Sequence, residues 1–268
     1  MKPPPSILRR TSPSCPTPSP LPPSPPQRAG PQATQALRPR DAATLVIVDR
    51  SAPTPRVLMG RRHPGQVFLP DTFVFPGGRV EPADRALARR LALPPREAER
   101  LSYAVHGRPT DARAAALALA AIRETFEETG FVLGTPASGP PSAAPGAWLD
   151  FMRAGHHPRL DGLTFFARAI TPPGRTRRYD TRFFLTDAAA VTHCPGNLDG
   201  ELLDIDWFTL DEARRLNLPS ITHHVLEDVA KLLARPAKRL AARDVPFYRH
   251  RYGRFERTLL RPPEQNGR

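Results

Sequence analysis

The sequence predicts a mixed α/β domain, and three observations support this assignment. Short apolar runs rich in Val, Ile, Leu and Phe recur between residues 42 and 208 and are separated by turn residues, which is typical of strands. One alanine-rich segment, residues 111–129, has the composition of a long helix. The first 38 residues contain no acidic residue and almost no apolar run, so the folded part is expected to begin near residue 39.

The strands are expected where apolar residues cluster between turn signals. The first run, residues 42–48, is followed by a proline-containing turn at 51–55 and by a second run at 56–62, a pattern that predicts a hairpin. A third run at 72–75 is stopped by a Pro-Gly-Gly sequence. The later strands are predicted at residues 163–170, 179–185 and 202–208.

The helices are predicted from composition and from their end residues. The 111–129 helix is expected to begin at Thr110 or Asp111 as N-cap and to end at Gly130. A short helix is expected from Asp211, and a longer one from about residue 220 to 234. Two further helical segments, 85–93 and 95–104, show a polar face.

The domain organisation follows from composition. Of the 35 prolines, 13 lie within the first 40 residues, and such a segment cannot bury enough apolar surface to offset the entropy of ordering. We expect a disordered proline-rich tail at 1–38 and a domain at 39–235 that contains a helical insert at about 85–110. A basic extension at 236–268 is expected to pack on this domain as an arm.

The charge balance limits the classes of partner. The formal net charge is +13, and 36 of the 39 basic residues are arginine, which favours phosphorylated ligands such as nucleotides and cofactors. The arginines are scattered rather than gathered in one stripe, so nucleic acid is not the expected partner. No apolar window is long enough for a membrane span, and two cysteines cannot form a disulfide framework. This pattern favours a cytoplasmic location.

The end of the long helix concentrates acidic residues on one face. Successive residues of a helix are rotated by about 100°, so Glu124, Glu127 and Glu128 share one face and Phe126 lies on the opposite, apolar side. Three neighbouring carboxylates repel one another, and a hard divalent cation relieves that repulsion. On spacing alone, a solvated acidic face is the simpler interpretation.

The sequence upstream of the helix favours a metal site over a solvated acidic face. A strand ends upstream at Gly77-Gly78, where backbone can closely approach an ion or a phosphate. With Arg123-Glu124 through Gly130-Phe131, this segment resembles the box of the Nudix hydrolase superfamily, Gly-x5-Glu-x7-Arg-Glu-U-x-Glu-Glu-x-Gly-U with U apolar. The box departs from the pattern in that Asp84 replaces its first glutamate and Thr125 an aliphatic residue. Between Asp84 and Arg123 the chain has 38 residues, 85–122, where the pattern has seven, so 31 residues are additional.

The resemblance implies a fold, a reaction and a set of site residues. The fold is an α/β/α sandwich with a mixed sheet and a helical insertion inside the box, and the reaction is cleavage of a diphosphate. Glu124, Glu127 and Glu128 would hold Mg²⁺ or Mn²⁺ with the backbone carbonyl of Gly77. Arg123 would act in catalysis by bracing the loop and the helix through Asp84 or Glu81.

The interrupted box resembles one branch of the superfamily, which includes acyl-CoA diphosphatases. Two further segments are similar to that branch, one beginning at Arg61-Arg62 and the other running from Arg178 to Leu185. The implied substrate is coenzyme A or an acyl-CoA, a small-molecule diphosphate. Arg61, Arg62 and Arg178 are candidates for binding its phosphates, because guanidinium groups bind phosphate in a bidentate manner.

Several alternatives stay open at this point. The general base could be Glu124 or Glu201, although Glu201 is as readily explained as a solvated loop acid. The substrate could instead be a nucleotide sugar, ADP-ribose or a nucleoside triphosphate. A non-catalytic nucleotide sensor and an RNA end-processing enzyme are alternatives of other classes, and the sequence leaves a homodimer open.

Overall fold

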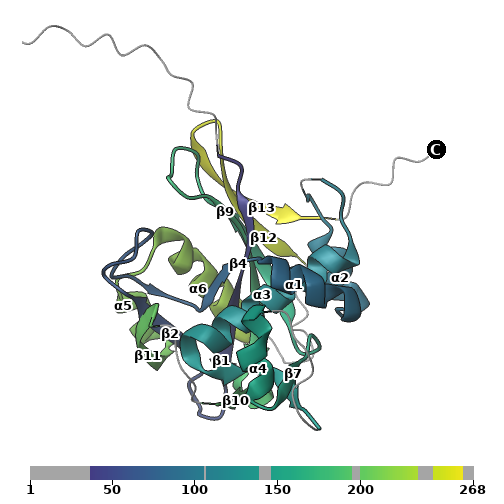
Figure 1. The fold of residues 1–268 in the computed structure, drawn as a ribbon. Helices are drawn as coiled ribbons and strands as arrows, with labels where there is room; N and C mark the ends of the chain where they lie inside the picture. Colours follow the sequence, from purple (N-terminus) through teal and green to yellow (C-terminus); the bar gives the residue numbers. More distant parts are fainter. Residues whose placement is uncertain (1–36, 106, 139–145, 195–199, 235–243, 262–268) are drawn as a thin grey trace, which may run out of the picture. The chain divides into compact units, whose positions relative to one another are not determined.

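A mixed nine-stranded sheet lies at the centre of the domain in the computed structural model (Figure 1). The structure describes residues 37–105, 107–138, 146–194, 200–234 and 244–261. The main strand order is β11-β2-β1-β9-β8-β12-β13, with β3 paired to β2 and β4 paired to β1. The sheet is mixed because β1 is parallel to β9 while β2 and β4 run antiparallel to β1. The predicted fold class is confirmed.

The bounds of the elements are as follows. The strands are β1 Arg40–Asp49, β2 Arg56–Arg62, β3 Phe73–Val74, β4 Gly77–Arg79, β5 Phe131–Val132, β6 Gly134–Pro136, β7 His156–Pro158, β8 Thr164–Ile170, β9 Tyr179–Asp187, β10 Thr192–His193, β11 Leu202–Thr209, β12 Val245–Arg251 and β13 Arg254–Leu260. The helices are α1 Pro82–Leu87, α2 Pro95–Leu101, α3 Asp111–Thr129, α4 Leu149–Arg153, α5 Leu210–Arg215 and α6 Ser220–Leu233, with short 3₁₀ turns at Ala88–Arg90, Gly146–Trp148 and Ala188–Ala190.

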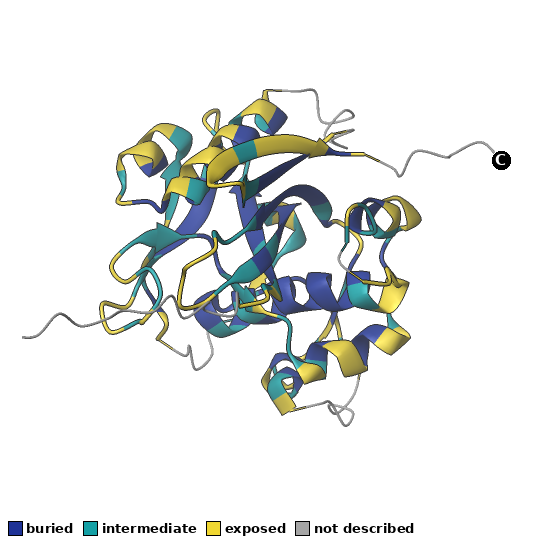
Figure 2. Cartoon of the chain, turned by 90° about the horizontal axis from the view of Figure 1, so that it is seen from above, coloured by how far each residue is buried: buried dark blue, intermediate teal, exposed yellow. Residues whose placement is uncertain are grey.

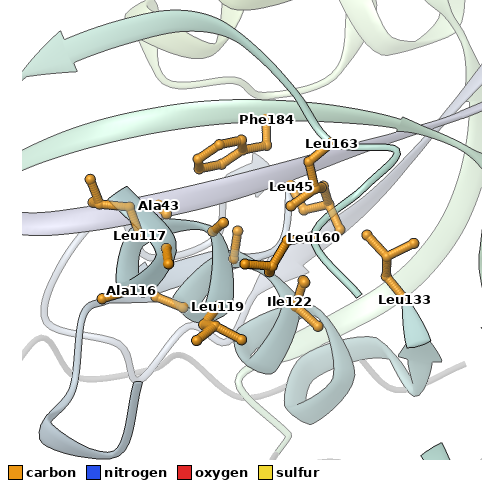
Figure 3. Packing of buried hydrophobic residues seen from close by; sticks show 14 of the residues in the cluster. Ala43, Leu45, Ala116, Leu117, Leu119, Ile122, Leu133, Leu160, Leu163 and Phe184 are labelled. Atoms are coloured by element: carbon orange, nitrogen blue, oxygen red, sulfur yellow. The ribbon is translucent and has the colours of Figure 1, made fainter. Parts of the chain in front are cut away.

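Strand β1 shows why the domain has three layers. Its side chains alternate between the two faces of the sheet, so Leu45 and Ile47 belong to one apolar cluster and Val46 and Val48 to the other. The first cluster contains α3 (Figure 3), and the second contains residues of α5 and α6. Exposed residues lie mainly on the outer surfaces of the helices and on loops (Figure 2). Helices therefore cover both faces of the sheet.

Helix α3 begins and ends as its sequence predicts. Thr110 is the N-cap, and its side chain accepts a hydrogen bond from the Arg113 N–H. Gly130 ends the helix in the left-handed conformation at φ 73°, which glycine adopts without steric cost. Most of the residues between these caps are buried against the sheet and the neighbouring helices. This burial fixes the direction in which the acidic end of α3 projects.

The insert within the box packs as part of the core. Leu87, Leu93 and Leu101 are buried in the same cluster as α3. Glu97 of α2 is buried as well, and its carboxylate accepts the Phe165 N–H at 2.8 Å, where the pairing of β8 with β9 is irregular. The insert is thus tied to both α3 and the sheet.

The C-terminal region differs from the expectation of a packed arm. Strands β12 and β13 form a hairpin, and β12 pairs in parallel with β8 through Phe247 and Tyr248. Residues 245–260 therefore extend the central sheet. The expected tail at 1–38 lies almost entirely outside the described residues, and so do residues 235–243 of the expected extension. Among the helices that the structure describes, none is long and apolar enough to cross a bilayer.

Candidate active site

The glycine pair brings the β4 strand against both β1 and α3. A Cβ on Gly77 would lie 2.5 Å from the Ala43 carbonyl oxygen, and a Cβ on Gly78 would collide with the carboxylate of Glu124. Only residues without a side chain permit this approach. The backbone of β4 consequently lies directly against the acidic end of α3.

Glu128 connects the helix to the glycine pair. Its side chain is buried, and Oε2 accepts the Gly77 N–H at 2.8 Å. The resemblance predicts that Gly77 contributes its carbonyl oxygen to a metal. The contact observed here involves the amide of Gly77, while the carbonyl role stays a prediction.

Arg123 is the electrostatic centre of the site. Its Nε and Nη2 donate to the Asp84 carboxylate at 3.0 and 3.1 Å, and Nη2 also donates to the Arg79 carbonyl oxygen at 3.1 Å. Nη1 lies 2.7 Å from Glu127 and 3.0 Å from Glu124. Burial alone would lower the pKa of Arg123, but the hydrogen bonds with Asp84 and the nearby carboxylates hold it above its usual value. Of the two partners expected for Arg123, the structure shows Asp84.

Asp84 is a fully buried structural carboxylate. It accepts the Glu81 N–H at 2.8 Å in the first turn of α1, and the indole N–H of Trp148 at 3.0 Å. With Arg123, these donors satisfy both of its oxygens. Sequence reasoning did not single out Trp148, because it lies 64 residues from Asp84 and outside the box.

Glu124 lies among other carboxylates and has Arg123 as an ion-pair partner at 3.0 Å. Burial, together with the negative charges of Glu127 and Glu201, raises the pKa of Glu124 to about 7, against the lowering effect of Arg123. The structure therefore brings Glu201, a loop residue far away in the sequence, close enough to influence the acidic end of α3. This placement is consistent with the candidate role of Glu201 at the site.

A cavity of about 410 Å³ opens over these residues, a size typical of small-molecule sites. One part of its wall is charged and comprises Arg62, Arg79, Glu81, Arg123, Glu124, Glu127 and Glu201. Another part is apolar or aromatic and comprises Phe68, Leu69, Val74, Phe75, Tyr179, Phe183, Pro219 and Ile221. Phe68 and Tyr179 contact each other edge to face, with ring centroids 5.6 Å apart.

The three candidate phosphate-binding arginines separate in space. Arg62 lies on the cavity wall, where its guanidinium donates to the Phe68 carbonyl oxygen at 3.0 Å. Arg61, the preceding residue of the same strand, forms ion pairs with Asp71 and Asp204 at 2.6 and 2.7 Å. Arg178 donates to two backbone carbonyls, and neither Arg61 nor Arg178 is among the described residues that line the cavity. Arg79, which the sequence did not single out, does line the cavity.

The donor chemistry of the site fits a hard divalent cation. Glu124, Glu127 and Glu128 offer only oxygen atoms, which Mg²⁺ and Mn²⁺ prefer. Across the described ranges, no three Asp, Glu, His or Cys side chains form a ready-made metal cluster. Arg123 donates to Glu127, and the Gly77 amide donates to Glu128. A cation would offset the repulsion that Glu127 and Glu201 exert on Glu124.

Comparison with known proteins agrees with this geometry. No protein-family model matches the chain. It is 30% identical over 176 residues to the acyl-coenzyme A diphosphatase NUDT19 of Homo sapiens, which covers 48% of this chain and 47% of the human protein. The corresponding protein of Gallus gallus is 30% identical over 205 residues, or 54% of each chain. The chain thus spans about half the length of the curated relatives it matches.

A solved structure extends the comparison to the fold. A Nudix hydrolase from Alicyclobacillus acidocaldarius is 28% identical, with a TM-score of 0.54, and the match covers 72% of this chain and 92% of that one. The chain therefore has the Nudix hydrolase fold and is related in sequence to the Nudix hydrolases.

Proposed function

We propose that this protein is a metal-dependent diphosphatase that cleaves the phosphoanhydride bond of a nucleoside diphosphate linked to another group. The observation that carries the proposal is the position of Glu124 and Glu127 on the wall of a cavity that also contains arginines. Carboxylates provide a cation site, and guanidinium groups bind phosphate oxygens. Together they match the charge pattern of a diphosphate.

The protein's own groups have distinct roles in this proposal. Glu124, Glu127 and Glu128 would hold Mg²⁺ or Mn²⁺, with the Gly77 carbonyl as a further ligand. When bound, the cation neutralises charge on the diphosphate and on the leaving group. The Arg123–Asp84 pair is a positioning device, because it fixes α3 relative to the β4 segment.

Phosphate binding and proton transfer are assigned to the charged wall. Arg62 of β2 and Arg79 of β4 would contact the phosphates. Glu201 or Glu124 would accept the proton of the attacking water, since both line the cavity and neither belongs to the buried Asp84 pair. Metal binding by Glu124 would compete with that role.

The apolar wall supports a substrate with a long, partly apolar arm. Phe68, Leu69, Tyr179 and Ile221 offer aliphatic and aromatic contacts beside the charged wall. The names of the human and chicken relatives point to acyl-coenzyme A. We therefore propose coenzyme A or its acyl esters as substrate, with 3′,5′-ADP and 4′-phosphopantetheine or its acyl form as products.

A substrate panel tests both the diphosphatase activity and the choice of CoA or acyl-CoA as substrate. The protein is incubated with Mg²⁺ or Mn²⁺ and with CoA, an acyl-CoA, ADP-ribose, a nucleotide sugar and a nucleoside triphosphate, and the products are identified by mass. The highest kcat/KM is expected for CoA or acyl-CoA, with 3′,5′-ADP formed. A higher kcat/KM for ADP-ribose would overturn the CoA assignment alone. Absence of hydrolysis across the panel would overturn the enzymatic proposal and favour a nucleotide sensor.

A further inference from the structure

Three segments of the chain meet at one end of the central sheet. Strands β1 and β9 are parallel, with Arg40 opposite Tyr179, so both begin at this end. Strand β8 is antiparallel to β9 and ends there, and β12 ends there as well because it is parallel to β8. The start of β1 (residues 37–40), the β8–β9 loop (171–178) and the β12–β13 turn (250–255) therefore lie along the same end of the sheet (Figure 1). We call these three segments the basic rim.

The basic rim carries arginines and no acidic residue of its own. Arg178 donates to the carbonyl oxygens of Thr171 and Leu37 at 3.1 and 2.7 Å, and so ties the β8–β9 loop to the start of β1. Six further arginines of the rim are exposed and form no ion pair with another described residue: Arg38, Arg40, Arg175, Arg177, Arg251 and Arg254. Arginines that are scattered in the sequence are thus gathered by the strand order. Like charges held together in this way destabilise the folded state unless a partner neutralises them.

The length of the rim suits a chain of phosphates. Four strand spacings separate β1 from β13 in the order β1-β9-β8-β12-β13. At roughly 4.8 Å for each spacing, the rim is about 19 Å long. The phosphates along one stacked nucleic-acid strand follow one another at about 3.4 Å, so the rim matches about five nucleotides.

The tip of the rim exposes an aromatic ring that the fold itself does not require. Tyr252 and Gly253 join β12 to β13 with φ values of 51° and 74°, as in a type I′ turn. Asn, Asp and Gly are preferred at the first of these positions, and a bulky residue there is strained. Tyr252 is nevertheless 87% exposed, and the Arg251 guanidinium lies 5.1 Å from the centre of its ring. Neither packing nor turn chemistry explains this tyrosine, and a strained, exposed aromatic residue indicates a binding role.

From these observations we infer that the basic rim binds single-stranded nucleic acid, with the arginines on the phosphates and Tyr252 on a base. Guanidinium groups bind phosphate, and exposed aromatic rings stack on unpaired bases. Tyr252 directly follows Arg251, and the half-exposed Phe255 directly follows Arg254. This alternation fits a ligand in which phosphates and bases alternate, whereas a bilayer surface favours a continuous apolar face. The inference is independent of the proposed diphosphatase activity.

The experiment measures binding of the full chain to a fluorescein-labelled oligouridine of about 12 nucleotides, a length within the range of known single-strand sites. Fluorescence anisotropy is recorded in a metal chelator, so that metal-dependent hydrolysis cannot consume the probe. A Kd of roughly 1–100 µM is expected near 0.1 M salt, and log Kd should rise with the logarithm of the salt concentration by about 0.7 for each phosphate contacted. Duplex RNA of the same length and vesicles of phosphatidylcholine with phosphatidylserine are the competing ligands.

Two double variants remove charge from different loops of the rim. Arg175→Gln with Arg177→Gln alters the β8–β9 loop, and Arg251→Gln with Arg254→Gln alters the β12–β13 turn. Each should weaken oligouridine binding by about tenfold and lower the salt slope by about 1.4. The matched control is Arg89→Gln with Arg90→Gln, which removes two exposed arginines from the insertion in the box and should change Kd less than about twofold.

Tyr252→Asn separates stacking from charge. Asparagine suits the first position of a type I′ turn, so the hairpin is kept while the ring is lost. Kd should rise about fivefold or more with the salt slope unchanged.

Four results would overturn the inference. One is an equal loss of affinity in the rim variants and in the Arg89 and Arg90 control, because net charge alone would then explain binding. The others are an unchanged Kd in Tyr252→Asn, tighter binding to duplex RNA than to oligouridine, and binding to the vesicles without binding to oligouridine. The last result would identify the rim as a membrane contact instead.

Discussion

Arg123 and Asp84 form a bidentate ion pair that joins the two parts of an interrupted motif. The Nε–Oδ1 and Nη2–Oδ2 distances are 3.0 and 3.1 Å, and both side chains are almost completely buried. Thirty-eight residues separate the two in the sequence. Arg123 thus joins α3 to α1 through Asp84 and to β4 through the Arg79 carbonyl oxygen, across the insertion in the box.

The first prediction concerns this pair. Asp84→Asn leaves the buried Arg123 guanidinium without its main counter-charge, so we expect a loss of about 3–5 kcal/mol in the free energy of unfolding, measured by urea denaturation. Asp150→Asn is the matched control, because Asp150 pairs with Arg153 on an exposed helix surface and should cost less than about 1 kcal/mol. Equal losses in the two variants would contradict a structural role for Asp84.

The second prediction concerns acid stability. Burial of Asp41 raises its pKa, but the hydrogen bond from Arg113 and the charges of Arg182 and Arg113 outweigh burial, and the pKa lies below the usual aspartate value of 3.8. Asp41 therefore contributes stability that is fully present above pH 3.8 and is lost as the pH falls through its lower, folded-state pKa. The difference in unfolding free energy between wild type and Asp41→Asn should shrink as the pH falls below about 4.

Urea denaturation at intervals between pH 3 and pH 7 measures that difference. Asp211→Asn is a suitable control, because Asp211 is exposed and pairs with Arg214 on the surface of α5. A difference for Asp41→Asn that stayed constant throughout the range would show that the carboxylate has the same pKa in the folded and unfolded states.

The third prediction separates two adjacent arginines. Arg62 lies on the wall of the active-site cavity, and Arg61 is held by Asp71 and Asp204 away from it. If the proposed activity is correct, Arg62→Ala should raise KM by about tenfold or more, as expected for loss of one charge-assisted contact to phosphate. Arg61→Ala should change KM less than twofold. The reverse order in steady-state kinetics would restore Arg61 as the phosphate ligand.

Local patterns in the sequence were sufficient for much of this fold. The caps of α3 at Thr110 and Gly130, its buried face and the first hairpin all follow from residues close together in the chain. The interrupted box also located the acidic end of α3 and the pairing of Arg123 with Asp84.

The features that were missed depend on contacts between distant residues. The parallel pairing of β12 with β8 joins Phe247 to Arg168, and no local pattern marks it. Arg61 and Arg62 are adjacent in the sequence and look equivalent there, yet alternation along β2 gives them different neighbours. Trp148 reaches Asp84 only through tertiary packing.

The central claim is that the carboxylates of α3 serve a metal-dependent reaction. The most direct test measures kcat against Mg²⁺ concentration for Glu127→Gln and Glu128→Gln, with exposed Glu99→Gln of α2 as control. Glutamine keeps the size of the side chain and the oxygen that accepts from Arg123 in the case of Glu127 and from the Gly77 amide in the case of Glu128, so both variants should still fold in a chelator. If α3 holds the metal, kcat should fall by about 10²-fold or more in both variants and stay near wild type in Glu99→Gln. Curves for Glu127→Gln and Glu128→Gln that match wild type within about twofold would contradict it.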